Sequence, residues 1–222
     1  MQLPFPDRTA AGRRLAEALR GYRLGSEAVV LGLPRGGVPV AEVVAQALGA
    51  ALDIIIVRKL GLPGQEELAM GAIASGGGRA LNEDLAEMLH LDEADIARVE
   101  ARERRELERR EKLYRGDRPA PAIKGRDVVL VDDGLATGAT MRAAVAAVRS
   151  LGPARVIVAV PVAPAEAVAR LREEADEVVC LATPEPFLAV GRWYRDFGQT
   201  SDAEVGAALA RAWGTDPQGG AS

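Results

Sequence analysis

Residues 128–140 read Val-Val-Leu-Val-Asp-Asp-Gly-Leu-Ala-Thr-Gly-Ala-Thr, a stretch that predicts a buried strand, an acidic turn and the start of a helix. Four apolar residues, three of them valines, are typical of a buried strand. Two adjacent carboxylates, Asp132 and Asp133, follow at its carboxyl end, and a loop rich in Gly and Thr then opens a helix predicted over residues 139–151. The start of a helix attracts a phosphate because its backbone N–H groups are unpaired. Carboxylates beside it suit sugar hydroxyls or a hydrated metal ion, so the stretch predicts a site for a phosphorylated sugar.

The same stretch resembles the phosphoribosyl diphosphate (PRPP) signature of type I phosphoribosyltransferases. In that family four hydrophobic residues, two acidic residues and a short Gly/Thr loop follow one another, and the match here has no gap. The alternative is an ordinary strand-to-helix turn with an aspartate as the helix cap. A cap needs one aspartate and no Thr-Gly-Ala-Thr. Two other phosphate motifs, Gly-x-x-x-x-Gly-Lys-Ser/Thr and a Gly-x-Gly-x-x-Gly after a strand, do not occur in the sequence.

The resemblance implies a role for each residue of the signature. Asp132 and Asp133 would bind the ribose hydroxyls and, through water, Mg²⁺. The 5′-phosphate would be held by backbone N–H groups and two hydroxyls of Ala136, Thr137, Gly138, Ala139 and Thr140. In the family, PRPP chelates Mg²⁺, a nitrogen nucleophile attacks C1 of the ribose, and pyrophosphate leaves. Magnesium keeps several waters and takes ligands from phosphates, so we expect no dense protein cage around it.

The remaining sequence alternates apolar strands with helices. Strands are predicted at residues 29–33, 52–57, 156–160 and 178–181, and helices at residues 38–48 and 165–175. This alternation predicts an α/β fold, a central, mostly parallel sheet with helices on both faces. The resemblance implies the type I phosphoribosyltransferase fold with a small flap or hood region. We expect one domain over residues 1–215 and a disordered tail at residues 216–222.

A strongly charged segment, about residues 92–115, is predicted as an inserted helix. Glu and Arg are mixed in it in nearly equal numbers, and its apolar residues are Ile96, Val99, Leu107 and Leu113. These are too sparse for a core helix, so we expect a solvated helix held by ion pairs between residues four apart. The purine enzymes of the family offer no counterpart for it.

Two further loops should meet the signature at the carboxyl edge of the sheet, where ligands of such folds bind. Arg35, Gly36 and Gly37 resemble the short pyrophosphate loop of the family, in which backbone N–H groups bind the leaving group and a strained peptide is common. A plain glycine turn is the alternative. Arg58 and Lys59 begin a stretch similar to one in adenine phosphoribosyltransferases that starts the mobile loop over the substrate.

In that comparison Arg58 and Lys59 would be catalytic, because they would neutralise pyrophosphate as it departs. The alternative is that both cations simply end a strand in water. Residues 60–67 are predicted as the Gly- and Pro-bearing loop, and residues 69–73 and 79–81 as a hairpin.

The segment 187–197 holds several of the few aromatic residues of the chain. It is loosely similar to the Phe-Val-Val-Gly stretch of hypoxanthine-guanine enzymes, with one residue inserted. The similarity implies base contacts for Phe187, Trp193 and Tyr194. A flap that packs these rings onto the sheet is the alternative.

Composition limits the function classes. A net charge of −4 argues against a general nucleic-acid binder, and no apolar run reaches the length of a membrane span. The N-terminus lacks a signal-peptide pattern, and the single Cys180 argues against a disulfide framework or a cysteine metal site. We therefore expect a cytoplasmic protein that binds PRPP, Mg²⁺ and a small-molecule acceptor, with no nucleic-acid or membrane partner. A homodimer is one possible assembly.

As a whole the chain resembles a bacterial branch of phosphoribosyltransferases whose acceptor is unassigned. The implied reaction transfers a 5-phosphoribosyl group from Mg-PRPP to a nitrogen nucleophile, with a nucleobase favoured, as in nucleotide salvage. One alternative is a regulatory protein that binds PRPP or a nucleotide without efficient catalysis, although no helix-turn-helix or basic patch is evident. A hydrolase is the other, but His90 is the only histidine and no Gly-x-Ser-x-Gly occurs.

Overall fold

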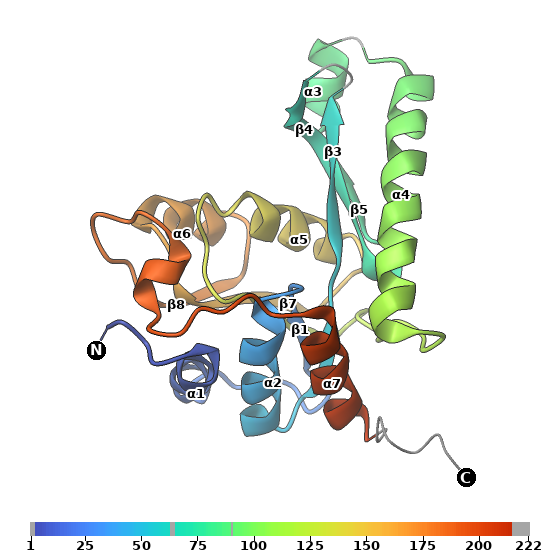
Figure 1. Cartoon of the computed structure of the whole chain (residues 1–222). Coiled ribbons are helices and arrows are strands. Elements are labelled where there is room, and N and C mark those ends of the chain that lie inside the picture. Colours follow the sequence, from blue (N-terminus) through green and yellow to red (C-terminus); the bar gives the residue numbers. More distant parts are fainter. Residues whose placement is uncertain (1–2, 63–64, 90, 215–222) are drawn as a thin grey trace.

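The computed structural model describes residues 3–62, 65–89 and 91–214. His90 and the tail at residues 216–222 therefore lie outside the described residues. In chain order the elements of Figure 1 are α1 (Arg8–Leu19), β1 (Val29–Gly32), α2 (Gly37–Leu48), β2 (Ala51–Ile54), β3 (Val57–Leu62), β4 (Gln65–Ala74), β5 (Arg79–Leu81), α3 (Glu83–Met88), α4 (Glu93–Arg115), β6 (Asp127–Val131), α5 (Ala139–Arg149), β7 (Arg155–Val162), α6 (Ala165–Arg172), β8 (Glu177–Ala182) and α7 (Asp202–Trp213), with short 3₁₀ turns at Ser75–Gly77 and Val190–Trp193.

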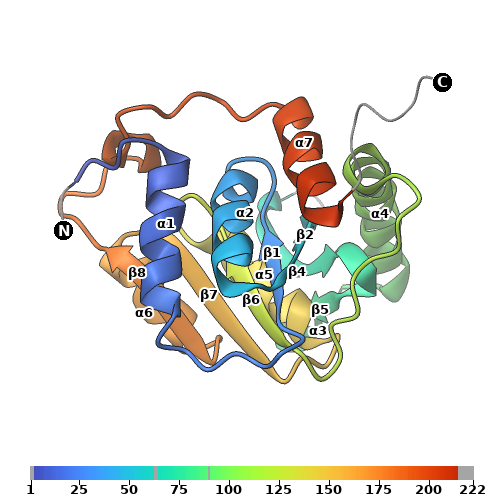
Figure 2. The same cartoon turned by 90° about the horizontal axis from the view of Figure 1, so that it is seen from below.

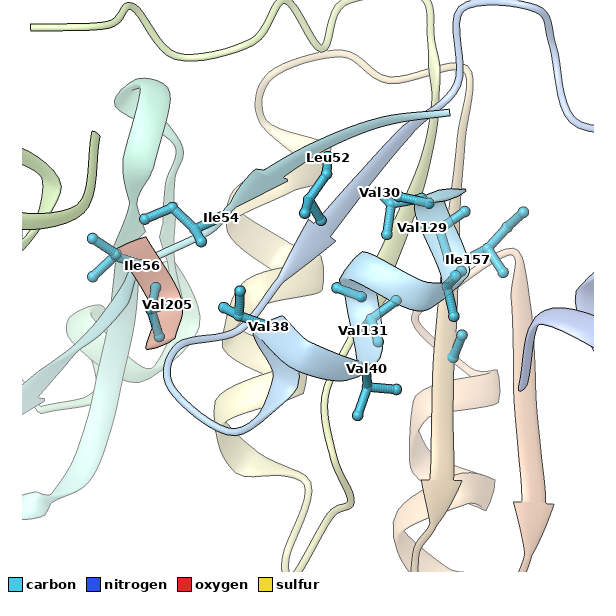
Figure 3. Close-up of a cluster of buried hydrophobic side chains, with 14 of the residues drawn as sticks. Val30, Val38, Val40, Leu52, Ile54, Ile56, Val129, Val131, Ile157 and Val205 are labelled. Carbon is cyan, nitrogen blue, oxygen red and sulfur yellow. The ribbon is translucent and has the colours of Figure 1, made fainter. Parts of the chain in front are cut away.

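Five parallel strands in the order β2-β1-β6-β7-β8 form the central sheet. Successive residues of a strand point to opposite faces. Val30 and Val129, which are paired in register, pack in one cluster with side chains of α1, α2 and α7. Figure 3 shows those of α2 and α7. Val29 and Val128 pack on the other face with side chains of α5 and α6. The expected α/β fold with helices on both faces is confirmed, and Figures 1 and 2 show the two helical layers.

The strand order reverses its direction between β1 and β6. The chain steps outward from β1 to β2 on one side, and from β6 through β7 to β8 on the other. The helix after β1, α2, covers one face of the sheet, whereas the helix after β6, α5, covers the opposite face. Adjacent loops that leave toward opposite faces open a crevice at the carboxyl ends of their strands. Residues 33–36 and 132–138 flank this crevice.

A second, antiparallel sheet, β3-β4-β5, stands away from the parallel sheet together with α3 and α4 (Figure 1). The predicted strand at residues 52–57 ends at Ile54, and Leu60–Leu62, predicted as loop, belong to β3. The reason is pairing with β4, in which Arg58 lies opposite Ile73. Such pairing depends on partners distant in sequence. The predicted hairpin is confirmed by the pairing of β4 with β5. Residues 65–67 of the predicted loop belong instead to β4, and residues 63–64 lie outside the described residues.

The charged segment is a helix with ion pairs between residues four apart, as predicted, but the prediction that it lies outside the core is wrong. Leu107 of α4 is buried, and Ile96, Val99 and Tyr114 pack against the same core as β3 and β4. These residues follow one another at intervals of three, eight and seven positions, so they share one face of the helix. Arg115 anchors the end of α4 through a buried ion pair, with 2.9 Å between its Nη2 and Asp53 Oδ1 of β2. Helix α4 is thus packed into the fold beside β2, the edge strand of the parallel sheet.

Candidate functional site

The loop after β6 presents unpaired backbone N–H groups. Those of Ala136, Thr137, Gly138 and Thr140 donate no hydrogen bond to any residue that the structure describes, whereas that of Ala139 donates to Thr137 Oγ1 at 3.3 Å. Gly138 takes φ +76° at the N-cap of α5, a conformation that favours glycine. The N–H groups lie at the positive end of the helix dipole, and Thr137 and Thr140 are accessible from solvent. The loop can therefore hold a phosphate.

Asp132 and Asp133 lie half-buried at the end of β6. The backbone N–H of Asp133 donates to Asp132 Oδ1 at 2.8 Å, which orients the first carboxylate. Burial, together with repulsion from Asp133, raises the pKa of Asp132 well above its ordinary value. Burial also raises the pKa of Asp133, partly offset by Arg8. Since both carboxylates lack sufficient compensating charge, this position favours a cation or hydroxyl donors.

Arg8 and Tyr194 support Asp133, and neither contact was expected from sequence. Arg8 Nε donates to Asp133 Oδ2 at 2.8 Å, and its guanidinium lies 4.0 Å from the centre of the Phe197 ring. The Tyr194 hydroxyl donates to the backbone oxygen of Asp133 at 2.5 Å, and its ring is buried between Phe5 and Phe197. No local signal links Arg8 to Asp133, because 125 positions separate them. The position of Tyr194 suits support of the acidic loop better than contact with a base.

The loop at Arg35–Gly37 lies directly against the two carboxylates. A Cβ atom at Gly36 would overlap the Asp133 carboxylate, and one at Gly37 would lie 2.7 Å from the Val131 oxygen. Glycine is therefore required for this close approach. The peptide between Pro34 and Arg35 is cis. The backbone N–H of Gly37 donates to the backbone oxygen of Leu33, while that of Gly36 has no hydrogen-bond partner within the described ranges. The 35–37 loop and the signature loop thus meet at one crevice.

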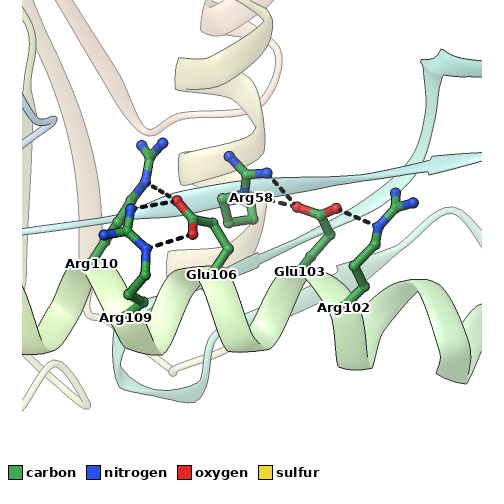
Figure 4. Close-up of polar contacts among 6 residues, drawn as sticks. All are labelled: Arg58, Arg102, Glu103, Glu106, Arg109 and Arg110. Carbon is green, nitrogen blue, oxygen red and sulfur yellow. Dashed lines mark hydrogen bonds and ion pairs between the residues drawn. The ribbon is translucent and has the colours of Figure 1, made fainter.

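Arg58 and Lys59 lie on β3 with different partners. Arg58 Nε and Nη2 donate to Glu103 Oε2 of α4 at 2.8 and 2.6 Å (Figure 4). Lys59 is exposed, and the described residues give it no ion-pair partner. Both residues line a groove of about 350 Å³ that also includes Thr140. The structure therefore brings Lys59 to the rim of the loop after β6 without an ion-pair partner among the described residues, whereas Arg58 is paired with Glu103.

Phe187 and Trp193 pack together beyond the end of β8. Their ring centres are 6.2 Å apart, and both pack against the small core that includes Phe5 and Val162. The indole Nε1 of Trp193 is buried without a hydrogen-bond partner among the described residues. The rings therefore lie in a packed flap, and base contacts by Phe187 and Trp193 stay predictions.

The two carboxylates fit a metal ion that arrives with its own phosphate ligands. No group of three or more His, Cys, Asp or Glu side chains suited to a metal gathers among the described residues. Asp132 and Asp133 supply only a pair of oxygen-bearing groups, which suits a hydrated Mg²⁺ bound mainly by a diphosphate.

Comparison with known proteins agrees with this arrangement. The profile of the phosphoribosyl transferase domain matches residues 4–191. The chain belongs to the phosphoribosyl transferase family. Two proteins of Mycobacterium tuberculosis, from strains CDC 1551/Oshkosh and ATCC 25618/H37Rv, are each 53% identical over 208 residues, or 94% of this chain and 47% of theirs. Their names assign them provisionally to the phosphoribosyl transferases. This chain spans about half the length of these curated relatives.

A solved structure supports the same phosphoribosyl transferase fold. The protein TT1426 from Thermus thermophilus superposes with a TM-score of 0.86 at 49% identity, covering 95% of this chain and 99% of that chain. The resemblance carried by residues 128–140 is thus confirmed at the level of family and fold. None of the described helices of this phosphoribosyl transferase is both long and apolar enough to cross a membrane.

We predict that Asp132→Asn stabilises this phosphoribosyl transferase at neutral pH. The folded-state pKa of Asp132 is raised, so its ionisation opposes folding above the unfolded pKa of about 3.9. Removing the charge should raise Tm at pH 7 by roughly 2–4 °C, the shift that about 1 kcal/mol produces in a domain of this size. Calorimetric melting at pH 3 and pH 7 provides the measurement.

The gain should vanish at pH 3, where the carboxyl group is protonated in both states. Asp133→Asn is the matched control, because it removes a carboxylate that Arg8 already pairs with, and it should gain less. A Tm of Asp132→Asn below that of the wild type at pH 7 would contradict the raised pKa.

Proposed function

We propose that this protein transfers a 5-phosphoribosyl group from Mg-PRPP to a nitrogen nucleophile and releases pyrophosphate. The contact between the Gly36–Gly37 loop and the Asp132–Asp133 carboxylates, beside the phosphate loop, carries the proposal. A sugar whose 5′-phosphate lies on residues 136–140 would place its hydroxyls at the carboxylates and its diphosphate over the glycines. Three chemistries that PRPP requires are therefore found at one edge of the sheet.

The residues of the site would act mainly through electrostatics. As the bond at C1 breaks, negative charge grows on the departing diphosphate and positive charge grows on the ribose. Of the two cations of β3, Lys59 would serve the leaving group, since Glu103 holds Arg58. Asp132 and Asp133 would fix the ribose through its hydroxyls and would orient waters of the metal. Mg²⁺, when bound with the diphosphate, would supply further positive charge there.

A nucleobase is the acceptor that the surroundings favour. Phe187 and Trp193 place two neighbouring aromatic rings beyond β8, and both side chains are only partly buried. Planar heteroaromatic ligands commonly use stacking surface together with a few hydrogen-bonding groups. The proposal includes a role in nucleotide salvage in the cytoplasm, by a domain that extends over residues 1–215.

The second candidate is a regulatory protein that binds PRPP or a nucleotide without efficient turnover. One observation favours it: cations expected to serve the diphosphate already have acidic partners. Arg58 is bonded to Glu103, and Arg35 Nη1 lies 3.8 Å from Asp202 Oδ1. A reaction that used Arg35 or Arg58 for the diphosphate would require them to exchange these partners for the ligand, whereas a sensor could leave them in place.

The test is pyrophosphate release from PRPP and Mg²⁺ across a panel of purine and pyrimidine bases and ammonia. Release with any acceptor supports the transferase. PRPP binding without release on any acceptor supports the regulatory protein. If PRPP does not bind at all, both proposals fall.

A further inference from the structure

The charged helix α4 and the pyrophosphate loop enclose a cavity of about 350 Å³. Arg35 of the loop, Thr140 of α5 and Asp202 of α7 line it, together with Arg109, Arg110 and Tyr114 of α4. We propose that this cavity is a diphosphate subsite to which α4 contributes Arg109 and Arg110. The inference rests on the proposed function and extends it to a helix that sequence analysis left without a role.

The cavity is continuous with the phosphate-binding edge. Arg35 precedes the glycines that touch the carboxylates, and Thr140 lies in the first turn of α5. A ligand whose 5′-phosphate occupies the α5 loop and whose diphosphate reaches Arg35 would therefore extend toward α4. The far wall that such a diphosphate meets is the face of α4 that carries Arg109 and Arg110.

Glu106 holds these two arginines side by side. Arg109 Nε and Nη2 donate to its carboxylate at 2.8 and 3.0 Å, and Arg110 Nε donates at 2.7 Å (Figure 4). The two guanidinium groups lower the pKa of Glu106 to about 2, so its carboxylate stays ionised and keeps both arginines bonded to it. The Nη groups of Arg110 and Nη1 of Arg109 keep their donors without a partner among the described residues. Guanidinium donors in this state suit a phosphate.

The charge of the lining favours a polyanion. Three arginines and one carboxylate, Asp202, line the cavity, and with Glu106, which pairs with Arg109 and Arg110, the group still carries one net positive charge. Asp202 accepts a hydrogen bond from the Tyr114 hydroxyl at 2.5 Å and lies 3.8 Å from Arg35 Nη1. Burial raises the pKa of Tyr114 to about 12, so the hydroxyl remains a donor at neutral pH. The Asp202 carboxylate therefore competes with a diphosphate for the Arg35 guanidinium.

Two changes should therefore shift diphosphate affinity in opposite directions. Arg109→Gln with Arg110→Gln removes two cationic donors and should weaken Mg-pyrophosphate binding by about 10- to 100-fold. Asp202→Asn removes the competing carboxylate and should tighten binding by about three- to ten-fold. Arg104→Gln is the matched control, because Arg104 is a half-exposed arginine of α4 that pairs with Glu100 and does not line the cavity.

Isothermal calorimetry with Mg-pyrophosphate and, separately, with ribose 5-phosphate tests the subsite, with circular dichroism to verify each fold. Ribose 5-phosphate should bind all variants like the wild type, because its phosphate belongs to the α5 loop. A double variant that binds pyrophosphate as tightly as the wild type and Arg104→Gln would overturn the inference, as would a wild type that binds none. Arginine-dependent pyrophosphate binding without transfer to any acceptor would instead refute only the proposed transferase activity.

Discussion

Replacing Asp132 and Asp133 together by asparagine should abolish turnover while the fold remains intact. The two side chains follow the end of β6 beside the Arg35–Gly37 loop, and burial raises the pKa of both. Asparagine keeps the size of each side chain but cannot provide the negative charge that orients ribose hydroxyls and metal waters. The loss of such electrostatic contacts should lower kcat by at least about 10³-fold.

The measurement is pyrophosphate release with the best acceptor of the wild type, together with circular dichroism and the melting temperature. Asp117→Asn, which alters an exposed carboxylate after α4, is the control and should turn over normally. Full activity of the double variant would show that the signature is retained here without a catalytic role.

Lys59→Ala should lower kcat by about 10²- to 10³-fold, or roughly 3–4 kcal/mol, with a smaller effect on PRPP binding. Lys59 is an exposed cation on β3 at the groove shared with Thr140, and no described residue neutralises it. Bond cleavage adds negative charge to the leaving group, so a nearby cation stabilises the transition state more than the bound substrate. Arg58 cannot simply replace it, because its Nε and Nη2 are bonded to Glu103.

Steady-state kinetics with PRPP varied would separate the effect on kcat from that on KM. Lys124→Ala is the matched control, since Lys124 is exposed and precedes β6 at the opposite edge of the sheet. If Lys59→Ala and the Arg58→Ala/Lys59→Ala double variant both turn over like the wild type, β3 does not serve the departing pyrophosphate.

The parallel sheet and the position of the signature could be predicted because local sequence determines them. Val128–Val131 are all buried, and their apolar, β-branched character is visible without a structure. The Gly and Thr residues that follow mark the start of α5 in the same way. A strand followed directly by a helix also fixes the edge at which the loops must meet.

The supports of the site could not be predicted, because they depend on residues far apart in the chain. Arg8 reaches Asp133 only after α1 has packed on the sheet, and Tyr194 reaches it from beyond β8. Lys59 likewise lies within a strand only because β3 pairs with β4, whose residues begin at Gln65. Local composition carries none of these contacts.

The packing of α4 could not be predicted for a related reason. Its few apolar residues fall on one face, and long Arg and Glu side chains complete its packing through ion pairs with other elements. Arg58 with Glu103 and Arg79 with Glu100 are such pairs. A charge pattern read along one helix detects pairs within the helix, whereas pairs with β3 and β5 appear only in the fold.

Calorimetric titration of PRPP with and without Mg²⁺ tests the central claim most directly, because it requires no knowledge of the acceptor. PRPP should bind in the presence of Mg²⁺ and at least about tenfold more weakly in EDTA, a difference of about 1.4 kcal/mol. The reason is that the Asp132 and Asp133 carboxylates would repel the polyanion PRPP unless a cation lies between the carboxylates and the ligand. Equal affinity in both conditions, or no binding in either, would contradict a metal-bridged PRPP site at this edge of the sheet.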